Sequence, residues 1–134
     1  MSYLKKPNYD EINHMKKILV VEDERSILNL IKINLEPEHE VITAMSGDEA
    51  LVAVKKIKPD LVILDINLPG MSGWEVCRRF KKMPKIKNVP VLFLTGLSDS
   101  DDNMAISEIL GAHDFLTKPF DPEELVEYVG NIFP

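Results

Sequence analysis

The sequence predicts an α/β domain of three layers, with helices on both faces of one doubly wound, parallel sheet of five strands. Short runs rich in Val, Ile and Leu alternate with segments whose apolar residues recur at helical spacing. Four of the five runs are almost continuously apolar, which is typical of strands buried on both faces of a parallel sheet. The 134 residues suffice for one such domain with its own core.

In the first part of the chain, two apolar runs predict strands over residues 18–21 and 41–44. A helix follows each run, because apolar side chains then recur every three or four positions and share one helical face. Ser46 and Glu49, three residues apart, indicate a capping box at the start of the second helix. The two apolar faces consist of Ile27, Leu28, Ile31 and Leu35, and of Ala50, Leu51, Val54 and Ile57.

The middle of the chain repeats this pattern with strands expected over residues 61–64 and 91–94. Gly73 precedes a helix predicted from Trp74 to about Met83, which Pro84 ends. A fourth helix is expected over residues 102–110, with a glycine as its C-cap.

The last expected strand, residues 115–116, leads into a final helix that begins at Asp121. Asp121 and Glu124 form a second capping box, and Pro122 suits the first helical position. Residues 16–134 therefore predict a single domain. Residues 1–15 are polar and show no clear period, so we expect a flexible N-terminal extension, with an ordered cap as the alternative.

Composition excludes several classes of protein. Sixteen Lys and Arg against 22 Asp and Glu give a net charge of −6, which disfavours general affinity for nucleic acids or anionic membranes but allows a local basic patch. The single cysteine cannot form an internal disulfide, and no apolar run approaches the roughly 18 residues of a membrane helix. No signal peptide is evident. We expect a cytoplasmic protein without direct contacts to nucleic acid or membrane.

Polar side chains stand where four of the expected strands end. Glu22 and Asp23 follow the first strand, Asp65 the third, Thr95 the fourth and Lys118 the fifth. The carboxyl ends of strands in an open doubly wound sheet border the crevice in which ligands bind. We therefore expect these side chains to converge on one site, although the acidic pair could instead only cap the following helix.

Three carboxylates in a small space repel one another, and without compensation at least one would become protonated. A divalent cation removes this problem, and a few oxygen ligands with room for water favour Mg²⁺. Lys118 would balance the remaining charge, and the Thr95 hydroxyl could donate to an anionic group. This combination predicts that Asp65 accepts a phosphoryl group.

Four stretches of the chain are similar to the receiver domain of bacterial two-component response regulators, in the same order and at similar separations. They are KKILVVEDE, LVILDINLPGMSG, VLFLTG and FLTKPF, and the resemblance covers about residues 16–132. It implies a flavodoxin-like (βα)5 fold, as in chemotaxis regulators, with strand order 2-1-3-4-5.

The resemblance also implies a role for each site residue. Asp65 is the expected phosphoacceptor, and Mg²⁺ is held by Glu22, Asp23, Asp65 and the backbone carbonyl of Asn67. Thr95 and Phe115 are the expected switch residues. Lys118 pairs with the phosphoryl group and precedes a proline whose peptide bond is cis in the family. This chain has Glu22 where Asp is frequent, and Phe115 where Tyr is often found.

The function implied is that of a switch and not of a turnover enzyme. A phosphohistidine on a sensor histidine kinase or histidine phosphotransfer protein would donate to Asp65. The surface formed by helix 102–110, strand 115–116 and the last helix would then change for a downstream output protein or domain. A monomer and a phosphorylation-dependent dimer both fit, as do a stand-alone receiver and a receiver from a longer regulator.

Two other functions fit the sequence less well. An Mg²⁺-dependent phosphohydrolase of the haloacid-dehalogenase type needs an Asp two residues after the nucleophile, where this chain has Asn67, which cannot transfer the proton. A flavodoxin needs a loop rich in hydroxyls and glycine after the first strand to hold the phosphate of FMN. Glu22, Asp23 and Glu24 stand there and would repel it.

Overall fold

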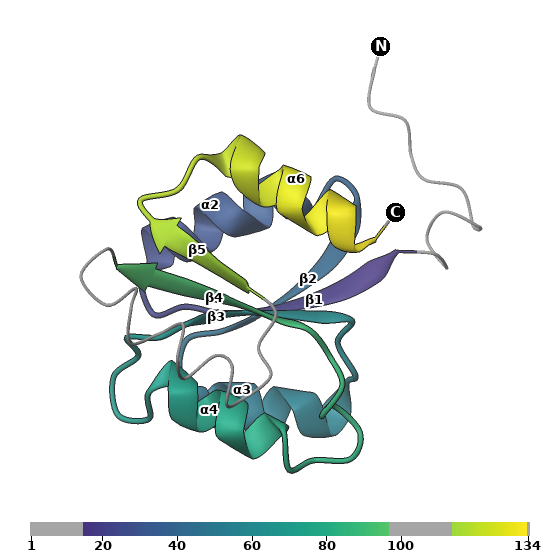
Figure 1. Cartoon of the computed structure of the whole chain (residues 1–134), viewed down its shortest axis with the longest axis vertical. Helices are drawn as coiled ribbons and strands as arrows, with labels where there is room; N and C mark the ends of the chain where they lie inside the picture. Colours follow the sequence, from purple (N-terminus) through teal and green to yellow (C-terminus); the bar gives the residue numbers. More distant parts are fainter. Residues whose placement is uncertain (1–14, 97–113, 134) are drawn as a thin grey trace.

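The structure is a computed structural model that describes residues 15–96 and 114–133. It contains five parallel strands: β1 (Lys16–Val21), β2 (His39–Ala44), β3 (Leu61–Asp65), β4 (Val91–Gly96) and β5 (Asp114–Lys118). They form one sheet in the order β2-β1-β3-β4-β5 (Figure 1). This confirms both the predicted parallel sheet and the strand order that the resemblance implied.

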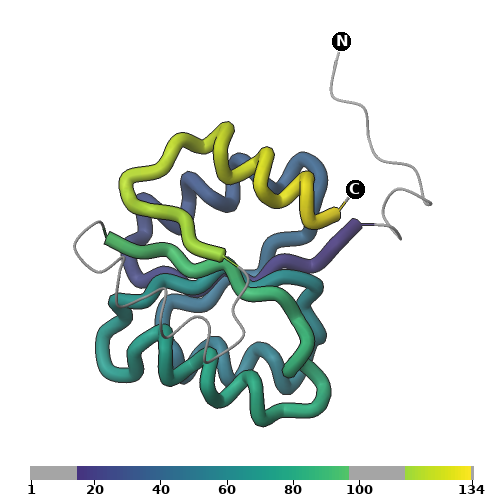
Figure 2. The backbone as a smooth tube through the Cα atoms, in the orientation of Figure 1, coloured from purple at the N-terminus to yellow at the C-terminus, as the bar shows by residue number. Residues whose placement is uncertain are grey.

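Four helices are described, and they cover the two faces of the sheet in pairs. Helices α2 (Arg25–Leu35) and α6 (Pro122–Ile132) lie on one face, and α3 (Gly47–Lys56) and α4 (Gly73–Phe80) lie on the other (Figures 1 and 2). None of them is long and apolar enough to cross a membrane. The helix expected over residues 102–110 and most of the expected N-terminal extension lie outside the described residues.

The two layers of core follow from alternation along the strands. Ile18 and Val20 of β1 pack with the apolar residues of α2 and α6, whereas Leu19 and Val21 pack with those of α3 and α4. Every residue of β3 is buried, as are all those of β4 except Gly96. Burial on both faces therefore explains why the central strands are continuous apolar runs in the sequence.

The edge strands are longer than their apolar runs. Strand β2 begins at His39 and is mostly half-buried or exposed, while β5 extends from Asp114 to Lys118 with an exposed Thr117. A strand at the edge of a sheet needs fewer apolar residues. The predicted runs 41–44 and 115–116 therefore mark only the better buried parts of β2 and β5.

Side-chain caps begin three of the helices. Ser46 accepts from the N–H of Glu49, whose carboxylate accepts from the N–H of Met45, which confirms the expected start of α3. Asp121 caps α6 as expected, but its side chain accepts from the N–H of Glu123 at 2.9 Å, and the N–H of Glu124 donates to the backbone carbonyl of Asp121 instead of completing the predicted capping box. The cap of α4, in which Ser72 accepts from the N–H of Glu75, was not predicted.

Helix α4 is shorter than expected, because it ends at Phe80 instead of near Met83. Lys82 and Met83 donate instead to the carbonyls three residues before them, so the chain leaves the helix through tight turns. The residue before a proline is disfavoured in the helical region, so Pro84 ends the α-helix earlier than its position alone suggests.

Gly73 lets α4 pack against the end of β3. Its N–H donates to the carbonyl of Ile66 at 2.9 Å, and an added Cβ would contact the carbonyl oxygen of Asp65 and lie 2.8 Å from Cα of Ile66. A side chain there would push α4 away from the backbone that carries Asp65.

We expect Gly73→Ala to lower the free energy of unfolding by about 1–3 kcal/mol, because backbone atoms must move to accept the methyl group. Gly130→Ala is the matched control: nothing lies within 4 Å of its added Cβ, and it stands inside α6. The control should raise stability by about 0.4–1 kcal/mol. Urea unfolding measures both, and equal stability of the two variants would contradict the close packing at Gly73.

Candidate functional site

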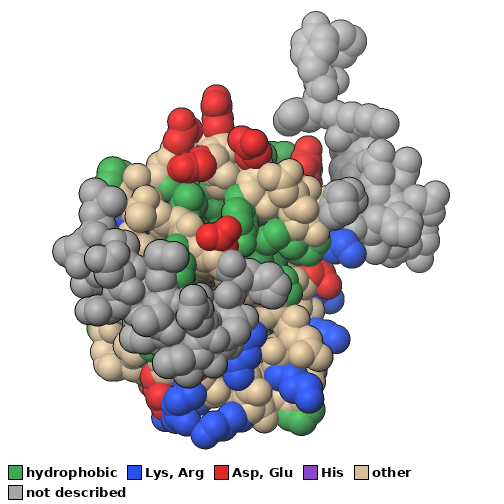
Figure 3. Space-filling view, viewed as in Figure 1, with side chains coloured by type: hydrophobic (Ala, Val, Ile, Leu, Met, Phe, Trp, Pro, Cys, Tyr) green, Lys and Arg blue, Asp and Glu red, His purple; other side chains and the backbone are tan. Residues whose placement is uncertain are grey.

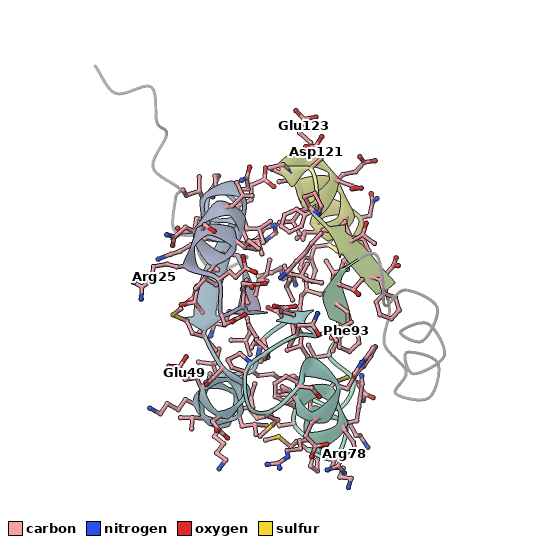
Figure 4. All side chains as sticks on the ribbon, turned by 90° about the vertical axis from the view of Figure 1, so that its left-hand side faces the viewer. Arg25, Glu49, Arg78, Phe93, Asp121 and Glu123 are labelled. Atoms are coloured by element: carbon pink, nitrogen blue, oxygen red, sulfur yellow. The ribbon has the colours of Figure 1, made fainter. Side chains whose placement is uncertain are left out.

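The polar residues predicted to converge do so at the carboxyl edge of the sheet. Glu22 and Asp23 follow β1, Asp65 ends β3, Thr95 is the last residue but one of β4, and Lys118 ends β5. The arrowheads of β4 and β5 in Figure 1 point toward this edge, and Figure 4 views the molecule from that side.

Three carboxylates meet there. Glu22 is fully buried, Asp65 is 3% exposed and Asp23 is half-buried. One oxygen from each lies within 4.8 Å of the others. The alternative role of the acidic pair, capping α2, is not observed, because the N-cap of that helix is Glu24 and it makes no side-chain capping bond.

Backbone N–H groups orient the two buried carboxylates in the same way. The N–H of Glu24 donates to Oε1 of Glu22 at 3.2 Å, and the N–H of Asn67 donates to Oδ1 of Asp65 at 3.1 Å. In both cases the donor lies two residues after the acid. The second oxygen of each carboxylate is thereby directed toward Lys118.

Lys118 bridges these two acids. Its Nζ lies 2.9 Å from Oε2 of Glu22 and 3.1 Å from Oδ2 of Asp65, and its side chain is 18% exposed. Because Lys118 belongs to β5, its side chain reaches across β4 to the ends of β3 and β1. Gly96, its register partner on β4, has no side chain to obstruct that path. The peptide bond from Lys118 to Pro119 is cis, as the resemblance implied.

Burial and neighbouring charges shift the protonation of this cluster. Burial raises the pKa of Glu22 to about 7; Lys118 opposes the rise and the charge of Asp65 adds to it. Burial alone would lower the pKa of Lys118, but the contacts with Glu22 and Asp65 outweigh it and the pKa is raised. Lys118 therefore remains a cation, and its single positive charge cannot neutralise all three carboxylates.

The donor set fits a hard divalent cation. All three candidate ligands are carboxylates, and such oxygen ligands are those that Mg²⁺ prefers. Oε2 of Glu22 is wholly buried, and among the described residues it has the ion pair with Lys118 but no hydrogen bond. Glu22, Asp23 and Asp65 could therefore hold a metal ion.

The two expected switch residues lie on one face of neighbouring strands. Thr95 is buried, and its hydroxyl donates to the carbonyl of Gly96 at 3.1 Å. Phe93 lies two residues before it, on the same face of β4, and is the register partner of Phe115 on β5. Thr95 and Phe115 are thus diagonal neighbours on the side of the sheet that α3 and α4 cover.

An aromatic cluster surrounds Phe115, and the sequence did not predict it. The ring of Phe115 stacks on Phe93 at 5.5 Å between centroids and meets Trp74 of α4 edge-on at 6.0 Å. Trp74 and Phe93 are 4.4 Å apart. The half-buried Phe115 therefore contacts both the sheet and α4.

Comparison with known proteins agrees with this geometry. Residues 18–130 match the family described as the response regulator receiver domain. PhoP of Bacillus subtilis, an alkaline phosphatase synthesis transcriptional regulatory protein, is 45% identical over 111 residues, which are 82% of this chain and 45% of that protein. The chain spans about half the length of the curated relatives it matches.

Solved structures with the same fold and more than 30% identity include a chemotaxis protein and a response regulator. The chemotaxis protein CheY4 of Vibrio cholerae has a TM-score of 0.83 at 33% identity, with 89% of this chain and 99% of that one covered. The response regulator DrrB of Thermotoga maritima, an OmpR/PhoB homologue, has a TM-score of 0.77 at 36% identity, with 87% and 52% covered.

Replacing Lys118 tests how much the buried acids depend on its charge. Lys118→Met leaves Glu22 and Asp65 without their cation, so in metal-free buffer we expect a loss of about 2–3 kcal/mol in the free energy of unfolding, somewhat below that of a fully buried pair. Glu22→Gln in the same background should recover part of the loss, because it removes one of the two uncompensated charges.

Urea unfolding of the two single variants and the double variant completes this cycle. Arg25→Met, at an exposed position of α2, controls for the loss of a positive charge. A double variant whose loss equals the sum of the single losses would show that Lys118 and Glu22 are not coupled.

Proposed function

Because the chain belongs to the response regulator receiver domain family, we propose that it is the phosphoacceptor of a two-component phosphorelay. Asp65 would take a phosphoryl group from a phosphohistidine on a sensor histidine kinase or histidine phosphotransfer protein. The observation that carries this proposal is the convergence of Glu22, Asp23 and Asp65, bridged by Lys118, at the carboxyl edge of the sheet.

In the transfer, a carboxylate oxygen of Asp65 forms a bond to phosphorus while the bond from phosphorus to the histidine nitrogen breaks. The imidazole leaves with the electron pair and takes up a proton. The backbone N–H of Asn67 holds Oδ1 of Asp65, and the Lys118 ammonium stands beside Oδ2, where it can donate to a phosphoryl oxygen. Later attack by water on phosphorus breaks the bond to the Asp65 oxygen, releases inorganic phosphate and returns Asp65 to its carboxylate.

Mg²⁺ would be held by Glu22, Asp23, Asp65 and the backbone carbonyl of Asn67. When bound, it would supply positive charge that offsets the negative charge of the phosphoryl oxygens. The chain offers no carboxylate at Asn67 to serve as acid–base catalyst for an external phosphate ester. We therefore favour a self-phosphorylating switch over the alternative of a phosphohydrolase with turnover.

Phosphorylation of Asp65 would change the positions of the side chains of Thr95 and Phe115. The Thr95 hydroxyl turns toward the new phosphoryl oxygen, and its movement frees space beside Phe115 on the same face of the sheet. Phe115 can then turn inward, although it lacks a hydroxyl to bond in either pose. The surface made by β5 and α6 would change with it, as a population shift between two states that an output protein or domain distinguishes.

The first test is covalent modification. With Mg²⁺ and acetyl phosphate, the intact protein should gain the mass of one phosphoryl group, and hydroxylamine should remove it as expected for an acyl phosphate. Asp65→Asn should gain nothing, whereas Asp48→Asn, which changes an exposed carboxylate of α3, should behave as the wild type. The same hydroxylamine-sensitive gain in Asp65→Asn would reject the assignment.

The second test follows Phe115 through the single tryptophan of the chain. The ring of Trp74 contacts Phe115, so its fluorescence should change when Phe115 turns away. Mg²⁺ with beryllofluoride, which stands in for the phosphoryl group, should cause this change. Asp65→Asn should abolish the change, and Phe115→Leu should reduce it while leaving phosphorylation intact. An unchanged response in Phe115→Leu would show that Trp74 reports another movement and that Phe115 is not the switch.

A further inference from the structure

Positive charge is concentrated on one side of the described structure and negative charge on the other. Residues 51–90 contain nine lysines and arginines but only three acids, although the whole chain has a net charge of −6. Figure 3 shows Lys and Arg gathered over the side of α3 and α4, and Asp and Glu gathered over the side of α6. The basic side is thus a local feature that the overall charge conceals.

Two lysines of this side line a hollow at the amino end of the sheet. Lys58, before β3, and Lys85, before β4, both line a hollow of about 250 Å³ with Asn88 and three prolines. Four more exposed or half-exposed lysines lie close in sequence to these two. We call the set the lysine face; it consists of Lys55, Lys56, Lys58, Lys82, Lys85 and Lys87.

The ion pairs of the described residues do not use these charges. Among the described residues, the ion pairs involve Arg78, Arg79 and Lys118, and none involves the lysine face. Lys55 and Lys56 stand in the last turn of α3, where a cation stabilises the helix dipole. That reason does not extend to Lys58 and Lys85, which lie in the loops that form the hollow.

We propose that the lysine face binds an acidic segment of a partner protein, with a carboxylate entering the hollow between Lys58 and Lys85. The hollow is small and walled by Pro59, Pro84 and Pro90, so it admits a side chain more readily than a stretch of nucleic-acid backbone. It lies at the opposite end of the strands from Asp65, and binding there does not require phosphorylation.

Two acids disfavour a continuous polyphosphate or an anionic membrane as the partner. Asp60 lines the hollow, with its Oδ2 accepting from the N–H of Lys17 at 2.8 Å, and Glu75 lies on the same side of the sheet. The rest of the chain carries more acids than bases, which repels an extended polyanion. A short acidic segment meets Asp60 and the surrounding lysines but few of the other acids, because screening confines their repulsion to roughly 8 Å at physiological salt.

The probe for this proposal is a fluorescent peptide of alternating Glu and Ala, titrated with the full chain and followed by anisotropy. We expect binding that weakens with salt and that falls by about tenfold in the double variant Lys58→Glu/Lys85→Glu. The matched control, Arg25→Glu/Lys32→Glu, makes the same change of charge on α2, across the sheet, and should bind as the wild type.

Three results would overturn the proposal. The first is an equal loss of peptide affinity in both double variants, and the second is no binding of the peptide to the wild type. The third is tighter binding of a short DNA duplex or of phosphatidylserine vesicles, with the same dependence on Lys58 and Lys85. Both variants should still gain a phosphoryl group from acetyl phosphate. This readout separates failure at the lysine face from failure of the proposed phosphorelay function.

Discussion

The bridge that Lys118 makes between Glu22 and Asp65 is the constraint on which the site depends. Two acids this deeply buried are unfavourable unless a cation stands between them. The bridge requires β1, β3 and β5 to end at the same level, and it requires β4 to leave an open path, which Gly96 provides. The parallel sheet is therefore what makes the cluster possible, because it brings together residues distant in the chain.

The central part of the fold could be predicted from the sequence because its strands are buried on both faces. Such strands are continuous apolar runs, and β1, β3 and β4 were located within one or two residues. The edge strands were harder to delimit, since exposed positions such as Glu40 and Thr117 carry no apolar signal. The cap at Ser72 was not predicted, although Ser72 and Glu75 have the spacing of a capping box.

The residues of the site could be predicted, but most of their contacts could not. The ends of parallel strands meet at one edge, so the type and place of Asp65, Thr95 and Lys118 follow from the strands alone. The aromatic cluster depends instead on the register that places Phe93 opposite Phe115, and on the angle at which α4 presents Trp74. Register is set by packing in three dimensions, and no local pattern of residues specifies it.

The two ends of the sheet have opposite electrostatic character, and this has a consequence for signalling. A strand of five residues is about 17 Å long, which is twice the distance over which charge is felt at physiological salt. A partner on the lysine face would therefore neither attract nor repel the phosphoryl group on Asp65 to a significant extent. It could hold the domain in place while the opposite edge stays open to a phosphoryl donor, so that any coupling between the two ends must pass through movement of the helices and not through charge.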